Sequence, residues 1–299
     1  MPDRRRASGA GAVRRQIEQL EQCRQSRVLV LATSSLELEI LPALYDMLRR
    51  IGPSPRLDLL LYCRGGAVNA ARRAALLLHD FTDRLAVIVP DRCESAGTIA
   101  ALAAQEIVAG PAAIFSPIDP ILETPSAAGE EPSAISAQDV RLFGQMAEQW
   151  FQLDPAEARA KALAALCESI FPTTLTAFYR ATLEVEAICA ELLSLGLPGA
   201  TAAAKAEIAD RLIYGHHSHG FALTGGDLGT LGLPVRRDEP AAALAWEIVS
   251  GLRASVGAGA RQAPDEDWFD TVVATSAGVM RRRRSMAVPA PRWEAGDLE

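Results

Sequence analysis

The feature that most constrains the fold is a regular alternation, between residues 28 and about 115, of short apolar runs and segments with helical spacing. The runs VLVLA, LDLLLY and LAVIV are continuously apolar, which is typical of parallel strands that are buried on both faces. The segments between them, such as LELEILPALYDMLRR and AVNAARRAALLLHDF, place apolar residues three and four positions apart. This order predicts βαβ units with right-handed crossovers, and therefore an α/β fold around a parallel sheet.

The same patterns divide the chain into a main domain and two flanking segments. Residues 1–27 lack the continuous apolar core of a signal peptide and are expected to be helical or flexible. Residues 28–256 are expected to form the main domain, which is helical from about residue 136, where Ser136 is a candidate N-cap. Residues 257–299 have a mixed and charged composition, and we expect a peripheral C-terminal extension.

Charge and composition exclude several classes of protein. The formal net charge of −7 and the pI near 5.3 argue against a nucleic-acid-binding protein, which needs a clustered basic face. The arginines do cluster, at residues 4–6 and 281–284, where we expect solvated tails. No apolar run approaches the roughly 20 residues of a membrane span, so we expect a cytoplasmic protein without one.

Cysteine usage gives no sign of a disulfide framework or of a metal site. The chain has five cysteines, an odd number, and none of them has CxxC spacing. We expect these cysteines to be reduced and mostly buried. No metal and no other cofactor is implied by the sequence.

Two stretches that follow predicted strands carry the candidate chemistry. In DRCESAGTIAALAAQ, Ser95 begins a helix of small residues, so its hydroxyl would lie in the positive field of a helix N-terminus beside the Ala96 amide. Serine is also a common N-cap, and the local pattern fits either a nucleophile or only a cap. Gly65 and Gly66, after LDLLLY, leave backbone amides unshielded at the start of the next helix, which fits an oxyanion hole or a purely structural turn.

A serine hydroxyl is a poor nucleophile until a neighbouring group takes its proton, so the candidate bases matter. The histidines in YGHHSHGFALT, including His219, could reach back to the serine or lie in a solvated loop, and no carboxylate or cysteine is placed beside them to complete a metal site. Lys161 would be a base only if burial lowered its pKa, and the alternative is a surface lysine. Asp119, between two prolines, could orient a histidine or stabilise its turn.

Four segments in sequence resemble the serine dehydrogenase proteinase family, a branch of the caseinolytic-protease/crotonase superfamily related to signal peptide peptidase A: LDLLLYCRGGAVNAARRAALLL, VPDRCESAGTIAALAAQEIVAGP, SPIDP and HGFALTGGDLGTLGLPV. The resemblance covers roughly residues 28 to 236. It implies a Clp/crotonase-like spiral of ββα units with a helical C-terminal part, and trimer-based or larger rings. It also implies Ser95 as nucleophile, with an oxyanion hole formed by the Gly65 and Gly66 turn and the Ala96 amide.

The chain departs from the family pattern at two places that bear on the site. The glycine turn of the family usually begins with threonine and proline, whereas Cys63 and Arg64 stand here. The histidine that caseinolytic proteases carry shortly after the serine helix is absent from AAIFSPIDP. His219 is the best counterpart of a later histidine of the family, although the aspartate that follows it there is missing. Lys161 remains the alternative base.

These observations lead to one preferred function and two alternatives. We expect an ATP-independent serine-type peptidase that hydrolyses a peptide or protein substrate through Ser95, with His219 as base and Asp119 nearby. The first alternative is a catalytically silent assembly or peptide-binding protein with the same fold. The second is a crotonase-type acyl-CoA enzyme. A homo-oligomer is expected in each case, and the apolar stripe in TTLTAFYRATLEVEAICAELL would suit its contacts.

Overall fold

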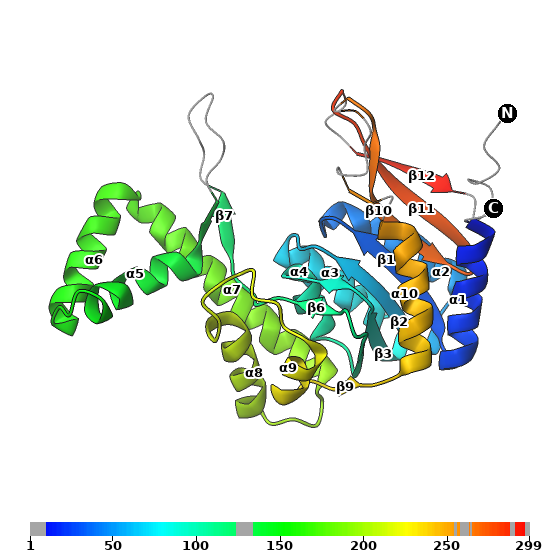
Figure 1. Cartoon of the computed structure of the whole chain (residues 1–299), viewed down its shortest axis with the longest axis horizontal. Coiled ribbons are helices and arrows are strands. Elements are labelled where there is room, and N and C mark those ends of the chain that lie inside the picture. The colour runs from blue at the N-terminus through cyan, green and yellow to red at the C-terminus, as the bar shows by residue number, and fades with distance from the viewer. Residues whose placement is uncertain are drawn as a thin grey trace.

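The computed structural model describes residues 10–123, 134–253, 256–257, 263, 265–287 and 291–296. An α/β body contains both ends of the described chain, and an arm of helices extends away from one side of it (Figure 1). The body holds the candidate site. The arm begins a short distance further along the chain.

A single large sheet forms the centre of the body. Its strands lie in the order β12-β11-β10-β1-β2-β3-β5-β9. The part from β1 to β9 is parallel, as the apolar runs predicted, and its strands are β1 (Arg27–Thr33), β2 (Ser54–Cys63), β3 (Thr82–Val89), β5 (Glu106–Ala109) and β9 (Val235–Arg236).

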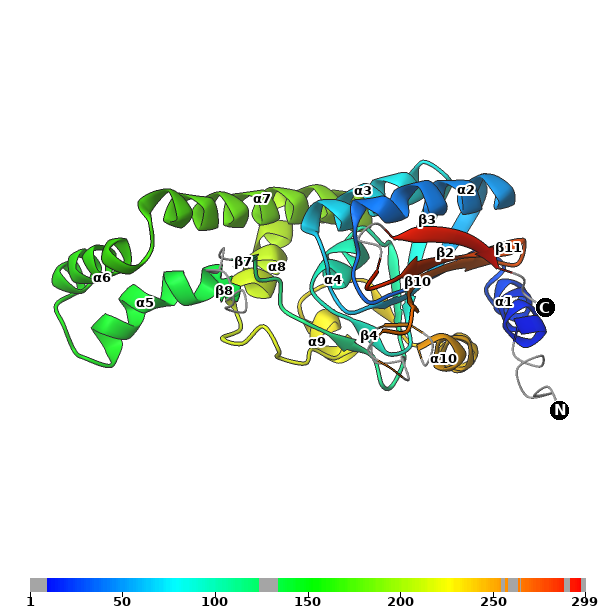
Figure 2. The same cartoon turned by 90° about the horizontal axis from the view of Figure 1, so that it is seen from above.

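Helices cover both faces of this sheet. They are α1 (Ala10–Arg24), α2 (Leu41–Ile51), α3 (Val68–His79) and α10 (Glu239–Arg253), with a 3-10 turn, η1 (Leu38–Ile40), before α2. Figure 2 shows α2 and α3 on one side and α1 and α10 on the other. Successive residues of β1 enter different cores: Leu29 packs with the α2 and α3 side, and Val28 with the α1 and α10 side. The strands are continuously apolar because both of their faces are buried.

Two short strands lie off the main sheet and place the serine. They are β4 (Arg92–Cys93), which pairs with β2, and β6 (Ile114–Phe115), which pairs with β4. Helix α4 (Ala96–Ala101) follows β4, so β3, β4 and α4 have the ββα order of the expected spiral. The Clp/crotonase-like α/β class is therefore the observed one, with its helical part after residue 136.

The arm is a hairpin followed by three helices. The hairpin pairs β7 (Ile121–Glu123) with β8 (Ala134–Ser136), and the helices are α5 (Ala137–Gln149), α6 (Pro155–Ser169) and α7 (Pro172–Gly196). Ser136 caps α5 as predicted, because its side chain accepts hydrogen bonds from the N–H groups of Gln138 and Asp139. The second half of α7 returns to the body and buries Val185 and Leu192 in its core, and it is followed by α8 (Ala202–Tyr214) and α9 (Gly225–Thr230).

The C-terminal segment differs from the sequence prediction of a peripheral extension with a solvated arginine tail. It forms β10 (Trp268–Thr275), β11 (Gly278–Arg284) and β12 (Arg292–Gly296), and β10 pairs antiparallel with β1. Arg282 is fully buried, and it donates to Asp270 Oδ1 at 2.8 Å and to Glu37 Oε2 at 2.9 Å. Compensation of its charge by two carboxylates is the reason why an arginine-rich run can lie inside a sheet.

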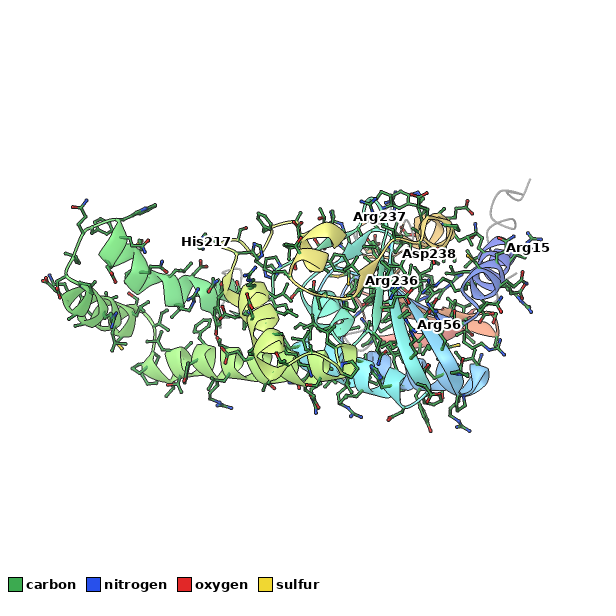
Figure 3. All side chains as sticks on the ribbon, turned by 90° about the horizontal axis from the view of Figure 1, so that it is seen from below. Arg15, Arg56, His217, Arg236, Arg237 and Asp238 are labelled. Carbon is green, nitrogen blue, oxygen red and sulfur yellow. The ribbon has the colours of Figure 1, made fainter. Side chains whose placement is uncertain are left out.

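A second buried charge cluster lies at the opposite ends of the parallel strands from the serine. Arg24 donates hydrogen bonds to three carboxylates, those of Asp58 at 2.7 Å, Glu106 at 2.7 Å and Asp238 at 2.6 Å. Figure 3 shows Asp238 at this edge of the body, together with Arg56, which also contacts Asp58 and Glu106. The cluster joins α1 to β2 and β5.

The cysteines and the helices bear on two further expectations. All five cysteines are free; Cys63, Cys93 and Cys189 are buried, whereas Cys23 and Cys167 are exposed. No single helix within the described ranges is long and apolar enough to cross a bilayer, and the sole candidate is the bent pair of α6 and α7, which meet at 113°.

Candidate active site

Ser95 occupies the N-cap position of α4 but does not act as a cap. Its side chain makes no capping hydrogen bond, and its backbone has φ 51° and ψ −110°. A positive φ is uncommon for any residue other than glycine and stores strain, which persists only where the surrounding structure imposes it. The Ser95 hydroxyl has no hydrogen-bond partner among the described residues, and the residue is half-buried. The hydroxyl is therefore held away from the helix and is open to another group.

The glycine turn lies directly beside Ser95. A Cβ built on Gly65 would come 3.6 Å from Ser95 Cβ. A Cβ built on Gly66 would come 2.3 Å from the backbone N and O of Leu36, so only glycine fits there. The turn is fixed by hydrogen bonds from Leu36 N–H to the Gly65 carbonyl and from Ala67 N–H to the Leu36 carbonyl, both of 2.8 Å.

Three backbone amides near the serine are open. Across the part of the chain that the structure describes, the N–H groups of Gly65, Gly66 and Ala96 donate no hydrogen bond. Ala96 is the first residue of α4, where N–H groups have no partner within the helix. The Ser95 N–H, in contrast, donates to Ser116 Oγ at 2.7 Å and is not open. The sequence analysis selected these three residues for an oxyanion hole, and that role stays a prediction.

One pocket of about 420 Å³ brings most of the predicted site residues together. Its lining includes Ser95, Gly65, Gly66, Asp119 and His219. These residues come from the ends of β2 and β4, the link after β6, and the loop after α8, which are far apart in sequence. The structure thus gathers at one place five of the residues that the sequence analysis selected.

Lys161 does not lie in this pocket. It is on α6 in the arm, where its side chain is 60% exposed and its Nζ pairs with Glu157 Oε1 at 2.6 Å. Because Lys161 is exposed, paired with Glu157 and outside the pocket, it does not reach Ser95 within this chain. Of the two bases that the sequence offered, only His219 lines the Ser95 pocket.

Asp119 and His219 each carry a buried atom without a hydrogen-bond partner. Asp119 Oδ2 accepts from Ser136 Oγ at 2.5 Å, whereas Asp119 Oδ1 has no partner among the described residues, and neither does His219 Nδ1. Buried polar atoms are almost always paired in folded proteins. Both residues line one pocket, so their unpaired oxygen and nitrogen atoms are available to bind a ligand or to transfer a proton there.

The other two histidines of the cluster take different positions. The His216 ring stacks on Phe221 with 4.7 Å between ring centroids, and His217 is exposed, at the surface between the body and the arm in Figure 3. Among the described residues, no group of three His, Cys, Asp or Glu side chains is arranged to hold a metal ion. The cluster contributes one histidine to the pocket.

The thiols beneath the pocket are held neutral. Burial raises the pKa of the Cys63 thiol to about 12, and Cys63 Sγ donates to the Gly65 carbonyl at 3.3 Å. Burial likewise raises the pKa of Cys93, which is the in-register partner of Cys63 on β4. Since the thiolate is the reactive form, neither cysteine competes with Ser95 as a nucleophile.

A second, mostly apolar pocket of about 320 Å³ opens beside the first and shares Asp119 and Pro120 with it. Its apolar walls come from α5, α7 and α8, with Leu175, Phe178 and Ile213 among them. The sequence analysis did not foresee this pocket, because it forms between helices that are distant along the chain.

The sequence analysis also missed the hydrogen-bonding partners of the site. Ser116, which accepts the Ser95 N–H, is the first residue of SPIDP, three positions before Asp119. No local pattern in the sequence marks it as a partner of the site. Ser136 was recognised only as a helix cap, and the structure adds its bond to Asp119.

Comparison with known proteins gives the family of this part of the chain. The sequence model of the ClpP-like SDH-type serine proteinases matches residues 11–137. This match confirms, over less than half of the chain, the resemblance noted in the sequence. The match includes Ser95, the glycine turn and Asp119, and it ends before His219.

Curated relatives and solved structures extend the comparison. Two uncharacterized proteins of Methanocaldococcus jannaschii are 35% identical over 78 residues and 38% identical over 80 residues, which is 25% and 26% of this chain. The matched segments span only 27% and 28% of those relatives. Similar solved structures include a mutant of the membrane-bound stomatin-specific protease 1510-N (TM-score 0.43, 16% identity, 78% of this chain and 86% of that one). They also include a mutant of ClpP1 from Listeria monocytogenes (TM-score 0.39, 13% identity, 75% and 98%).

Proposed function

We propose that the protein is a serine-type peptidase in which Ser95 is the nucleophile. The observation that carries this proposal is the strained backbone of Ser95, which keeps the hydroxyl off its own helix and inside a pocket that His219 and Asp119 also line. Strain of this kind is costly and is found where function needs it. A serine that only capped α4 would have the ordinary extended backbone of an N-cap residue and no such strain.

In the proposed reaction, Ser95 Oγ attacks the carbonyl carbon of a peptide bond while His219 takes the hydroxyl proton. The negative charge that develops on the carbonyl oxygen is stabilised by the N–H groups of Gly66 and Ala96. The C–N bond then breaks as His219 returns the proton to the leaving amine. His219 then takes a proton from a water molecule, whose oxygen attacks the acyl carbon. The bond from that carbon to Ser95 Oγ breaks as His219 returns the proton to Oγ, and the carboxylic acid product leaves.

Asp119 is the group that would orient the histidine. Its Oδ2 is held by Ser136, which leaves Oδ1 as the acceptor available within the pocket. A carboxylate that accepts from one imidazole nitrogen fixes the tautomer and stabilises the imidazolium that forms. The adjoining apolar pocket gives a place for an apolar side chain of the substrate.

Covalent labelling by a fluorophosphonate probe, read by intact mass, tests the proposal without knowledge of the substrate. We expect one label per chain, none on Ser95→Ala, and a rate lowered about 100-fold or more by His219→Gln. Lys161→Ala is the matched control and should label at the normal rate. Loss of labelling in Lys161→Ala, with normal labelling of His219→Gln, would assign the base to a lysine of another copy of the chain.

A catalytically silent binding protein is the second candidate. It is favoured by one observation, that the Ser95 hydroxyl has no hydrogen bond to any base within the described part of the chain. On this reading the probe leaves no label at all, and a peptide-library pull-down is equally effective with Ser95→Ala.

The proposal extends to assembly and location. We infer a homo-oligomer, trimer-based or larger, that acts in the cytoplasm and without ATP. The support for self-association is the set of large apolar side chains exposed on the arm, among which Trp150, Phe171 and Tyr179 are 80%, 73% and 64% exposed. Sedimentation velocity at several protein concentrations measures the oligomeric state.

A further inference from the structure

The strained conformation of Ser95 is held by a buried hydrogen-bond network that the proposed reaction does not use. Ser116 is 4% exposed, and its hydroxyl accepts the Ser95 N–H at 2.7 Å. The same hydroxyl donates its single proton to the Pro117 carbonyl at 3.1 Å, so that only its lone pairs face Ser95.

A second buried hydroxyl fixes Ser116 in turn. Thr98, on α4 and 1% exposed, accepts the Ser116 N–H on its Oγ1 at 3.3 Å and donates to the Cys93 carbonyl at 2.8 Å. The network therefore joins the end of β4, the first turn of α4 and the end of β6. These are the three segments between which the Ser95 backbone is placed.

A relaxed alternative exists for the serine backbone. An N-cap serine normally has an extended backbone and bonds its hydroxyl to the N–H of the second or third helical residue, here Gly97 or Thr98. That conformation would satisfy the hydroxyl and remove it from the pocket. Reaching it requires rotation of the Ser95 N–H away from Ser116, because φ and the direction of the N–H change together.

We propose that Ser116 is the positioning residue that keeps Ser95 in its strained conformation by holding the Ser95 N–H. Its effect on the rate of reaction rests on the proposed function, but its effect on the backbone does not. Ser116 does not touch the reacting atoms. Because the same serine is followed by Pro117, Ile118 and Asp119, it also ties the position of Ser95 to the segment that carries the candidate aspartate.

The first test measures strain and needs no activity. Glycine tolerates φ 51° and alanine does not, so Ser95→Gly should have a higher Tm than Ser95→Ala, by about 2 °C or more. With Ser116→Ala added to each, the difference should shrink, because nothing then holds the strained state. Glycine is also preferred to alanine as an N-cap, and a Tm difference of unchanged size in the Ser116→Ala pair would mean that this preference is its whole cause, which overturns the proposal.

The second test measures the consequence for the hydroxyl. Ser116→Ala should lower the rate of fluorophosphonate labelling about 10-fold or more, and Ser116→Thr, which keeps the hydroxyl, should restore much of it. Thr275→Val is the matched control, because the buried Thr275 hydroxyl also accepts a backbone N–H, that of Ala277 at 3.1 Å, in the turn between β10 and β11. Its labelling rate should stay normal. Equal losses in Ser116→Ala and Thr275→Val would reduce Ser116 to a residue that only stabilises the fold.

The two tests separate this proposal from the proposed function. If wild-type protein takes no label and the glycine-to-alanine difference still depends on Ser116, the positioning role stands and the peptidase does not. If labelling of Ser95 is normal and Ser116→Ala changes neither the rate nor the Tm difference, the peptidase stands and the positioning role is wrong.

Discussion

The ends of the parallel strands and the helical arm differ in the groups that they leave unpaired or exposed. Around Ser95 the chain is held by short hydrogen bonds among small buried residues, and the open groups are polar and few. On the arm, large apolar side chains face solvent, with Trp150 80% and Phe151 66% exposed in the link between α5 and α6. The second region has apolar surface that a partner would cover. If the proposed function is right, chemistry and assembly fall on different parts of the molecule.

The largest effect should come from the glycine turn, which has no freedom to adapt. In Gly66→Ala the new Cβ meets the Leu36 backbone at 2.3 Å and the φ of 134° is strained, so we expect a loss of about 3 kcal/mol or more in unfolding free energy, measured by urea denaturation. Gly65→Ala is also strained, at a φ of 121°, but its Cβ would lie 3.6 Å from Ser95 Cβ and would meet no backbone atom, so it should cost less. Equal losses would show that the turn is looser than its hydrogen bonds imply.

An intermediate effect is expected at the buried charge cluster, which tests whether the body depends on buried ion pairs, in contrast to the exposed pair of Lys161 and Glu157 on the arm. Burial acts to raise the pKa of Glu106, but Arg24, Arg56 and Arg84 outweigh it and hold that pKa below its ordinary value. A lowered pKa means that the stability contributed by the charged group is present above the ordinary pKa of about 4.5 and is lost as pH falls through the lowered value.

Glu106→Gln should therefore cost about 2 kcal/mol at pH 7 and should flatten the decline of stability in acid. The measurement is Tm as a function of pH between 3 and 7 for wild type and variant. Parallel curves would mean that Glu106 is not the group whose protonation weakens the body in acid.

The smallest effect on the isolated fold is expected on the arm. Trp150→Gln should change the unfolding free energy by less than about 0.5 kcal/mol at low protein concentration, because the side chain packs on little of its own chain. At high concentration the same variant should weaken self-association in sedimentation. A loss of about 2 kcal/mol in dilute protein would show that the arm is packed within one chain, and the contrast between the two regions would fail.

The strands β1, β2 and β3 could be predicted because each contains a continuous apolar run that is buried on both faces, so the local pattern contains the answer. Ser95 and the glycine turn could be placed for the same reason, since each follows such a strand by a few residues. The strands β10 and β11 could not, because the run Arg281 to Arg284 reads as solvated surface until Asp270 and Glu37 are known to surround Arg282. Arg282 and Glu37 are 245 positions apart, so their pairing leaves no local pattern in the sequence.

The conformation of Ser95 also lay beyond prediction. A serine before a run of small helical residues has the same local pattern whether it caps the helix or is rotated away from it. The conformation is decided by Ser116, directly after β6, and by the open space that Gly65 leaves beside the serine. His219 could be selected as a candidate from its family counterpart, but its place in the pocket depends on the fold of α8 and the loop after it.

Ser136 belongs to both regions at once. A single oxygen atom anchors the first turn of α5 and holds Asp119, and α7, about 37 Å long from its 25 residues, runs from the arm to the pocket wall at Glu184 and Val185. The arm is therefore joined to the pocket in two ways: α7 forms part of the pocket wall, and Ser136 holds Asp119 by a hydrogen bond. A displacement of the first turn of α5 would thus reach Asp119 through Ser136.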